Sequence, residues 1–146
     1  ETFGDGFFEK LVESESSTPR VLIDTEHFLG FVPFAARWPI EIQLLPKRHI
    51  QSLTELTEEE ATDFAKVYQK LLGAMDKLFD SPTPYIAAIH QAPKDDSSIR
   101  LMAKITSPRR AADKLKYLAG SESAMGAFIT DTSPEAIAEM LKEVLV

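Results

Sequence analysis

Apolar residues recur at intervals of three and four between residues 57 and 79, a spacing that predicts a long amphipathic helix. Thr57 and Glu60 form a capping-box pattern at its start, in which a hydroxyl and a carboxylate satisfy free backbone N–H groups. Pro82 and Pro84 follow the helix and stop it. One face is therefore expected to pack on a hydrophobic core, and it comprises Ala61, Phe64, Ala65, Tyr68, Leu71, Leu72, Met75, Leu78 and Phe79.

Shorter apolar runs, bounded by polar residues or prolines, predict the other elements. Strands are expected at 21–23, 28–32, 40–45, 85–90 and 99–106. Helices are expected at 5–16, at 109–119 and from Ser133 onward, with a small-residue loop at 120–126. Because short connections join the neighbouring strands, antiparallel pairing is favoured. The pattern predicts an α+β fold, in which helices pack on one face of an antiparallel sheet.

Composition narrows the possible function classes. A chain of 146 residues, 44% of them hydrophobic, is expected to fold as one domain, residues 1–146. Its formal net charge of −7 argues against a general nucleic-acid-binding surface, and no apolar run is long enough to span a membrane. The absence of cysteine excludes disulfides and thiolate metal sites. Because the chain begins with Glu1 and not Met, we expect it to be processed or part of a longer protein.

The histidines do not indicate a catalytic or metal site on their own. His27, His49 and His90 lie far apart in the sequence and fit no metal-ligand spacing. Local hydrogen bonding is the interpretation that we favour for each of them. The sequence also has no P-loop, nucleophile elbow or dinucleotide-binding glycine pattern.

The segment from Phe31 to His49 carries a much more specific signal. It contains the only tryptophan of the chain, three prolines and a basic end. It resembles a segment in the C-terminal half of galactose-1-phosphate uridylyltransferases through Val32-Pro33, Arg37-Trp38-Pro39, Glu41 and Leu44-Leu45-Pro46-Lys47-Arg48-His49. The resemblance implies a histidine-triad-like half-barrel, which is an antiparallel sheet with helices on one side.

The same resemblance continues through His90-Gln91-Ala92-Pro93. In the well-known bacterial type of the family, this histidine is the first ligand of a structural metal site. The positions of two further histidine ligands fall on Met102 and Lys104. A thioether and an ammonium do not replace two imidazoles around a divalent ion. We therefore expect no metal in this chain.

A third matching segment contains the candidate substrate-binding residues. The resemblance implies that Lys116, Tyr117, Ala119, Gly120 and Glu122 contact sugar and phosphate groups in the partner subunit of a homodimer. From the residues alone, an ammonium beside loop N–H groups could hold a phosphate. Alternatively, these lysines could simply complement the end of the helix expected at 109–119.

The family's nucleophile, the second histidine of an HPHGQ motif, has no counterpart here. The resemblance implies that the nucleophile and a zinc site belong to an N-terminal half. We therefore expect the C-terminal half of a cytoplasmic enzyme that exchanges UMP between UDP-glucose and galactose 1-phosphate, with no catalytic residue and no activity in the isolated chain. The alternatives are a non-catalytic binding or assembly domain and a related sugar-nucleotide phosphorylase.

Overall fold

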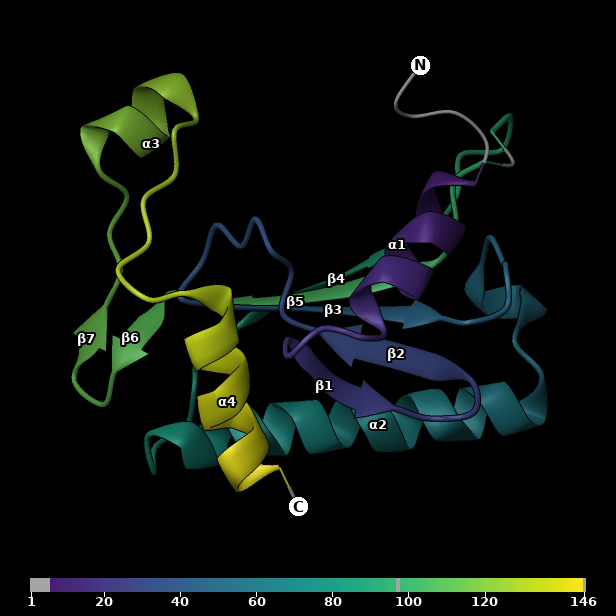
Figure 1. Ribbon diagram of the computed structural model, residues 1–146, viewed down its shortest axis with the longest axis horizontal. Helices are drawn as coiled ribbons and strands as arrows, with labels where there is room; N and C mark the ends of the chain where they lie inside the picture. The colour runs from purple at the N-terminus through teal and green to yellow at the C-terminus, as the bar shows by residue number, and fades with distance from the viewer. Residues whose placement is uncertain (1–5, 97, 146) are drawn as a thin grey trace.

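A computed structural model describes residues 6–96 and 98–145. A five-stranded antiparallel sheet has the order β1-β2-β3-β5-β4 (Figure 1). Its strands are β1 (Val21–Asp24), β2 (Phe28–Phe31), β3 (Ile40–Pro46), β4 (Ile86–His90) and β5 (Met102–Ser107). The helices are α1 (Phe7–Glu15), α2 (Glu58–Leu78), α3 (Gly120–Met125) and α4 (Pro134–Val144), with a short 3-10 helix at Leu53–Glu55. The predicted α+β antiparallel fold is confirmed.

The main core lies between the sheet and α2, with α4 packed beside them. Alternate residues of β3 point toward α2, because successive side chains in a strand face opposite sides. The predicted long helix and its capping box are both confirmed, since Thr57 and Glu60 bind each other's backbone N–H groups. Fully or nearly fully buried members of this core are Ile40, Ile42, Leu44, Val67, Leu71, Met75, Ile137 and Leu141.

The opposite face of the sheet is partly covered by α1. Leu29, Phe31 and Leu45 are fully buried there and contact Phe8 and Leu11, among other residues of the helix. The helices therefore lie on both faces of the sheet. The pattern had predicted that they would all pack on one face. The reason is that β2 is apolar on both sides, so each of its faces requires cover.

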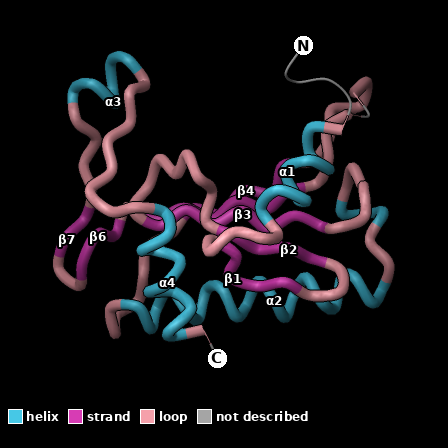
Figure 2. The backbone as a smooth tube through the Cα atoms, in the orientation of Figure 1, coloured by secondary structure: helices cyan, strands magenta, loops and turns pink. Residues whose placement is uncertain are grey.

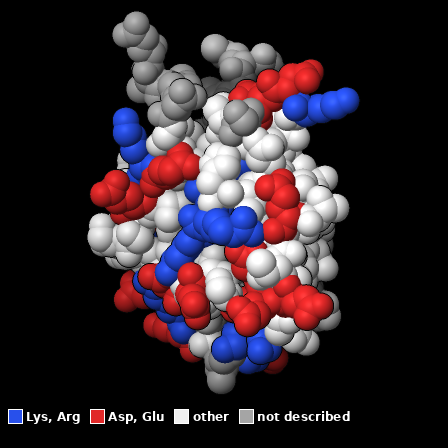
Figure 3. Space-filling view, turned by 90° about the vertical axis from the view of Figure 1, so that its right-hand side faces the viewer, with Lys and Arg blue, Asp and Glu red and all other residues white. Residues whose placement is uncertain are grey.

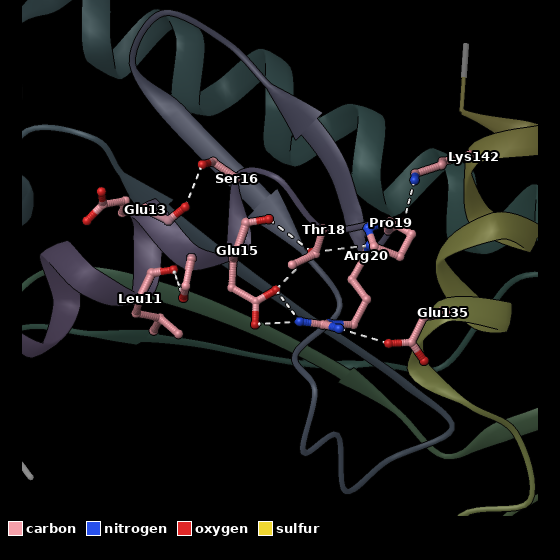
Figure 4. A network of polar contacts seen from close by, with 10 residues as sticks. Leu11, Glu13, Glu15, Ser16, Thr18, Pro19, Arg20, Glu135 and Lys142 are labelled. Carbon is pink, nitrogen blue, oxygen red and sulfur yellow. Dashed lines mark hydrogen bonds and ion pairs between the residues drawn. The ribbon is translucent and has the colours of Figure 1, made fainter.

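One arginine joins α1, β1 and α4. Arg20 donates hydrogen bonds to the carboxylates of Glu15 and Glu135, at 2.8 Å in each case (Figure 4). Lys142 of α4 donates to the carbonyl oxygen of Pro19 at 2.5 Å. These contacts fix the chain where it enters the sheet, at the end far from β4.

The structure differs from the sequence prediction after Pro108. In place of a helix at 109–119, β6 (Arg109–Ala111) and β7 (Lys114–Leu115) form a hairpin. In place of a loop at 120–126 there is the short helix α3, which ends at Gly126 with φ 65°. Residues 116–131, here called the arm, lead from β7 through α3 and back toward α4, and they stand away from the sheet (Figures 1 and 2).

Within the described ranges 6–96 and 98–145, the helices are too short or too polar to cross a bilayer.

Candidate functional site

Lys116 lies at the base of the arm, where it binds three acceptors. Its ammonium donates to the carbonyl oxygens of Ile129 at 2.7 Å and Arg37 at 3.0 Å. It also forms an ion pair with Glu122 at 2.5 Å. The two side chains are nearly buried, being 8% and 1% exposed. The ammonium therefore connects both sides of the arm to the loop that precedes β3.

Glu122 connects the two backbone segments of the arm, the one before α3 and the one after it. Its two carboxylate oxygens accept hydrogen bonds from the backbone N–H groups of Ala119 at 2.7 Å and Ile129 at 3.0 Å. The hydrogen bond from Lys116, together with these two N–H donors, lowers the pKa of Glu122 to about 2. The carboxylate is consequently ionised at neutral pH, and the pair is a closed, fully hydrogen-bonded unit.

Two further residues complete the surroundings of Lys116. The ring of Phe128 has the Arg37 guanidinium 5.1 Å and the Lys116 ammonium 5.9 Å from its centroid. Both distances are within the range of cation–π attraction. Sequence reasoning did not assign either Arg37 or Phe128 to this site. The Arg-Trp-Pro segment signalled only the family resemblance, and nothing in the sequence indicated that it contacts the arm.

A cavity of about 140 Å³ opens beside this network. Arg110 forms an ion pair with Asp131 at its rim. Four of the five predicted substrate-binding residues line the cavity, and the fifth, Gly120, is the first residue of α3. The cavity is lined by Arg110, Lys116, Tyr117, Ala119, Glu122, Ile129 and Asp131.

The arm exposes large apolar side chains. Tyr117 is 85% exposed and Met125 is 80% exposed. A side chain of this size normally buries most of its area in a core or an interface. The arm therefore presents apolar side chains that the described part of the chain leaves uncovered.

The positions compared with metal ligands meet on one face of the sheet. His90 lies directly opposite Met102 in the β4–β5 pairing, and Lys104 follows two residues later. The ammonium of Lys104 is 2.6 Å from the carboxylate of Glu41, whose side chain is 2% exposed. An internal ion pair thus occupies this face. Among the residues that the structure describes, no group of three or more His, Cys, Asp and Glu side chains could hold a metal ion.

A separate hollow of about 490 Å³ lies beside the start of α2. Its lining has four carboxylates and one lysine, an unfavourable balance for binding a phosphate. Acidic and basic side chains are interspersed over this end of the molecule (Figure 3). None of the predicted site residues belongs to the hollow, which is lined by Glu26, His27, Glu58, Glu59, Thr62, Asp63 and Lys66.

A family model described as galactose-1-phosphate uridyl transferase, C-terminal domain, matches residues 6–144. The chain belongs to this family. Within the galactose-1-phosphate uridyl transferase family, a relative from Thermotoga maritima named galactose-1-phosphate uridylyltransferase is 39% identical over 138 residues. The alignment covers 92% of this chain and 43% of that relative, so the chain spans less than half of its length.

Solved structures agree with this assignment. A uridylyltransferase mutant has a TM-score of 0.83 and 37% identity, over 90% of this chain and 44% of its own. An ADP-glucose phosphorylase from Arabidopsis thaliana, with ADP-glucose bound, has a TM-score of 0.79 and 27% identity, over 96% and 46% of the two chains.

A smaller protein confirms the histidine-triad-like fold. A zinc-bound histidine triad family protein from Mycobacterium smegmatis has a TM-score of 0.60 and 20% identity. The match covers 94% of this chain and 91% of that protein, so the shared fold accounts for nearly all of both. At this identity the likeness concerns the fold alone.

Proposed function

We propose that this domain is the C-terminal half of a cytoplasmic galactose-1-phosphate uridylyltransferase, which exchanges UMP between UDP-glucose and galactose 1-phosphate. The observation that carries the proposal is that the family match extends through the arm, and therefore includes the residues expected to meet sugar and phosphate. The nucleophilic histidine and the zinc site would belong to the N-terminal half. The present sequence contains no HPHGQ motif.

We assign the substrate contacts to the base of the arm. Lys116 supplies a cation for a phosphate oxygen, and Glu122 supplies a carboxylate for sugar hydroxyls. In the structure these groups bind each other, so a ligand would have to replace one or more of their present contacts. The backbone at Gly120 is open to an approaching group, because nothing lies within 4 Å of the position that a Cβ would take there. Tyr117 and the backbone of Ala119 would complete the contact surface.

We also propose that the complete enzyme is a homodimer in which the arm reaches the partner subunit. The exposure of Tyr117 and Met125 supports this assignment, since contact with a second subunit would cover both side chains. The ion pair between Lys116 and Glu122 would hold the arm in shape before the subunits meet. Such preorganisation reduces the entropy that is lost on assembly.

A chimaeric enzyme tests the proposal directly. The N-terminal half of the Thermotoga maritima relative would be joined to this chain, and uridylyl exchange would be assayed with UDP-glucose and galactose 1-phosphate. We expect turnover in the chimaera and none in the isolated 146-residue chain, because only the chimaera contains the nucleophile. A matched chimaera with Lys116→Met should lose about ten- to a hundred-fold in kcat/KM, corresponding to one charged hydrogen bond.

A second construction separates a wrong function from a poor junction between halves. Residues 114–131 of this chain would replace the corresponding arm of the intact Thermotoga enzyme. Retained exchange activity would support the assignment. A folded, dimeric enzyme that loses all exchange activity would contradict it and favour a non-catalytic binding or assembly domain.

A sugar-nucleotide phosphorylase is the second candidate function. The observation that favours it is the similarity to the Arabidopsis ADP-glucose phosphorylase over 96% of this chain. The same chimaera distinguishes the two reactions when it is supplied with ADP-glucose and inorganic phosphate. Release of ADP under these conditions, without uridylyl exchange, would assign the phosphorylase function.

A further inference from the structure

Glu41 of β3 carries a carboxylate that is almost completely buried, with 2% of its side chain exposed. One carboxylate oxygen is 2.6 Å from the ammonium of Lys104 on the neighbouring strand β5. The other oxygen accepts a hydrogen bond from the backbone N–H of Arg37 at 2.9 Å. The carboxylate therefore connects the sheet to the segment that precedes β3.

That segment, residues 32–39, leads from β2 to β3 without forming a strand or a helix (Figure 2). The N–H of Ala36 donates to the carbonyl oxygen of Pro33 at 3.1 Å and bends the segment into a turn. Arg37 follows this turn, and its backbone is bound at both polar groups. Its N–H donates to Glu41, and its carbonyl oxygen accepts from the ammonium of Lys116 at 3.0 Å. One residue thus lies between the sheet and the base of the arm.

The side chain of Arg37 contacts the other side of the arm. Its guanidinium is 5.1 Å from the centroid of the Phe128 ring, which lies after α3, whereas Lys116 lies before α3. Displacement of Arg37 would therefore disturb contacts with both backbone segments of the arm.

Stability alone does not account for the pair of Glu41 and Lys104. Burying a carboxylate is costly, and apolar side chains in place of a buried ion pair often leave a protein equally or more stable. An apolar side chain at position 41 would, however, offer no acceptor to the N–H of Arg37. Only a residue with an acceptor oxygen holds this segment against the sheet.

We propose that Glu41 is a positioning residue that determines where Lys116 lies, acting through the backbone of Arg37. The carboxylate fixes the N–H of Arg37, and the carbonyl oxygen of the same residue then accepts from the ammonium. Lys104 compensates the charge of the buried carboxylate. The effect on substrate rests on the proposed function, in which Lys116 binds a phosphate, whereas the effect on the arm does not.

Two variants isolate the acceptor oxygen at position 41. Both carry Lys104→Met, so that no ammonium is left without its partner. The amide variant adds Glu41→Gln, whose oxygen can still accept from Arg37. The thioether variant adds Glu41→Met, whose sulfur is a much weaker acceptor. As a control, Glu15→Gln weakens a buried ion pair with Arg20 that does not involve the arm.

Hydrogen exchange of the 146-residue chain is the primary measurement, because it needs no substrate. The amides of Ala119 and Ile129 donate to Glu122 within the arm, so their exchange reports local opening of the arm. Both should exchange about two- to ten-fold faster in the thioether variant than in the amide variant, the effect of losing one hydrogen bond. Equal rates in the two variants would overturn the proposal. An equal acceleration in Glu15→Gln would also overturn it, because general destabilisation would then explain the effect.

The chimaera with the N-terminal half of the Thermotoga relative tests the effect on substrate. The thioether variant of the chimaera should have a kcat/KM for uridylyl exchange about two- to ten-fold below that of the amide variant. This difference should disappear when both variants also carry Lys116→Met, because the group that is positioned is then absent. A difference that persists unchanged would overturn the proposal, since Glu41 would then act by a route other than Lys116.

The two measurements separate failure of this inference from failure of the proposed function. A chimaera with all native residues in this half that catalyses no exchange bears on the proposed function alone, and the amide rates still decide the role of Glu41. Uridylyl exchange in that chimaera, together with equal amide rates in the two variants, would leave the function standing and overturn the positioning role.

Discussion

The ion pair between Lys116 and Glu122 shows how single residues can serve two purposes at this site. Both side chains are nearly buried, and all the polar atoms that they present have partners in the folded chain. Removing one partner from such a pair is costlier than removing both, because a buried charge is left uncompensated. The pair therefore holds the arm together, in addition to any contact with substrate that we propose.

The titration of Glu122 gives a prediction at the residue scale. Its folded pKa of about 2 lies below the ordinary value of 4.5, so it contributes stability that is fully present above the ordinary pKa. That contribution falls as the pH drops from 4.5 toward 2. Glu122→Gln should therefore be less stable than the unmodified chain at pH 7, and the difference should shrink across this window.

Urea unfolding of both proteins between pH 7 and pH 3 measures this difference. Glu139→Gln on α4 is a suitable control, because it makes the same chemical change at an exposed position, where its effect on stability should be small. If the difference between Glu122→Gln and the unmodified chain is the same at pH 7 and pH 3, the carboxylate does not have the lowered pKa.

The face of the sheet that carries His90 contains a cross-strand contact that the sequence did not predict. The sequence resemblance compared Met102 and Lys104 with metal ligands of the family, and this correspondence stays a prediction. It did not reveal that Lys104 pairs with Glu41, because that contact depends on the register between β3 and β5. Cross-strand partners are set by the turns and by the packing of whole strands, and a single segment does not contain this information.

At the scale of elements, periodicity predicted the long helix well and failed after Pro108. Helix α2 has more than five turns of consistent spacing and a complete capping box, so local and tertiary preferences agree. Residues 109–115 are rich in Arg, Ala and Lys, which favour a helix locally, yet they form a hairpin. The N–H of Lys116 donates to the carbonyl oxygen of Pro108 at 2.6 Å, a contact that closes this hairpin.

The small helix α3 was missed for a related reason. Six residues are too few for a periodic signal to emerge. Its two usable signals were local, namely Glu122 three residues after Ala119 and the glycine at its C-terminal end. Because Ala119 has no hydroxyl, only half of the capping box is present, and the segment reads as a small-residue loop.

The packing of α2 supports a stability prediction. Leu71 is fully buried between the helix and the sheet, so Leu71→Ala should reduce the free energy of unfolding by about 2–5 kcal/mol. Phe64, which contacts Phe28 and Tyr68 through its ring, should lose a comparable amount on truncation to Ala. Denaturant midpoints measure both changes.

Leu118→Ala is the matched control for this prediction. Leu118 is 44% exposed in the arm, so the same chemical change should cost much less there. Equal shifts for Leu71→Ala and Leu118→Ala would show that the face of α2 is not the main core of the domain.

At the scale of the whole molecule, the described chain has a buried core and two surfaces with exposed apolar side chains. Its sheet and core are closed by α1, α2 and α4, and a histidine triad protein of similar extent shares that fold. The arm and the edge strand β4 both remain exposed (Figure 1). The arm is the surface that the sequence resemblance had already connected with a partner subunit, whereas only the structure reveals the open edge.

The proposed crossing of the arm between subunits gives a prediction for the complete enzyme. Consider two parents, one with Lys116→Ala and the other without the nucleophilic histidine of the N-terminal half. Each should be impaired alone, because both sites of its dimer carry the same defect. If the arm crosses, a mixed dimer has one site with both defects and one site with neither. Random exchange between equal amounts should therefore restore roughly a quarter of wild-type activity, since half the dimers are mixed and each has one intact site.

Subunit exchange is verified by mass spectrometry of differently tagged parents, and thermal melting shows whether Lys116→Ala leaves the fold intact. A mixture of Lys116→Ala with a second, differently tagged Lys116→Ala parent is the control and should gain nothing. If the two different parents exchange subunits but activity remains at the average of the parents, Lys116 acts within its own subunit.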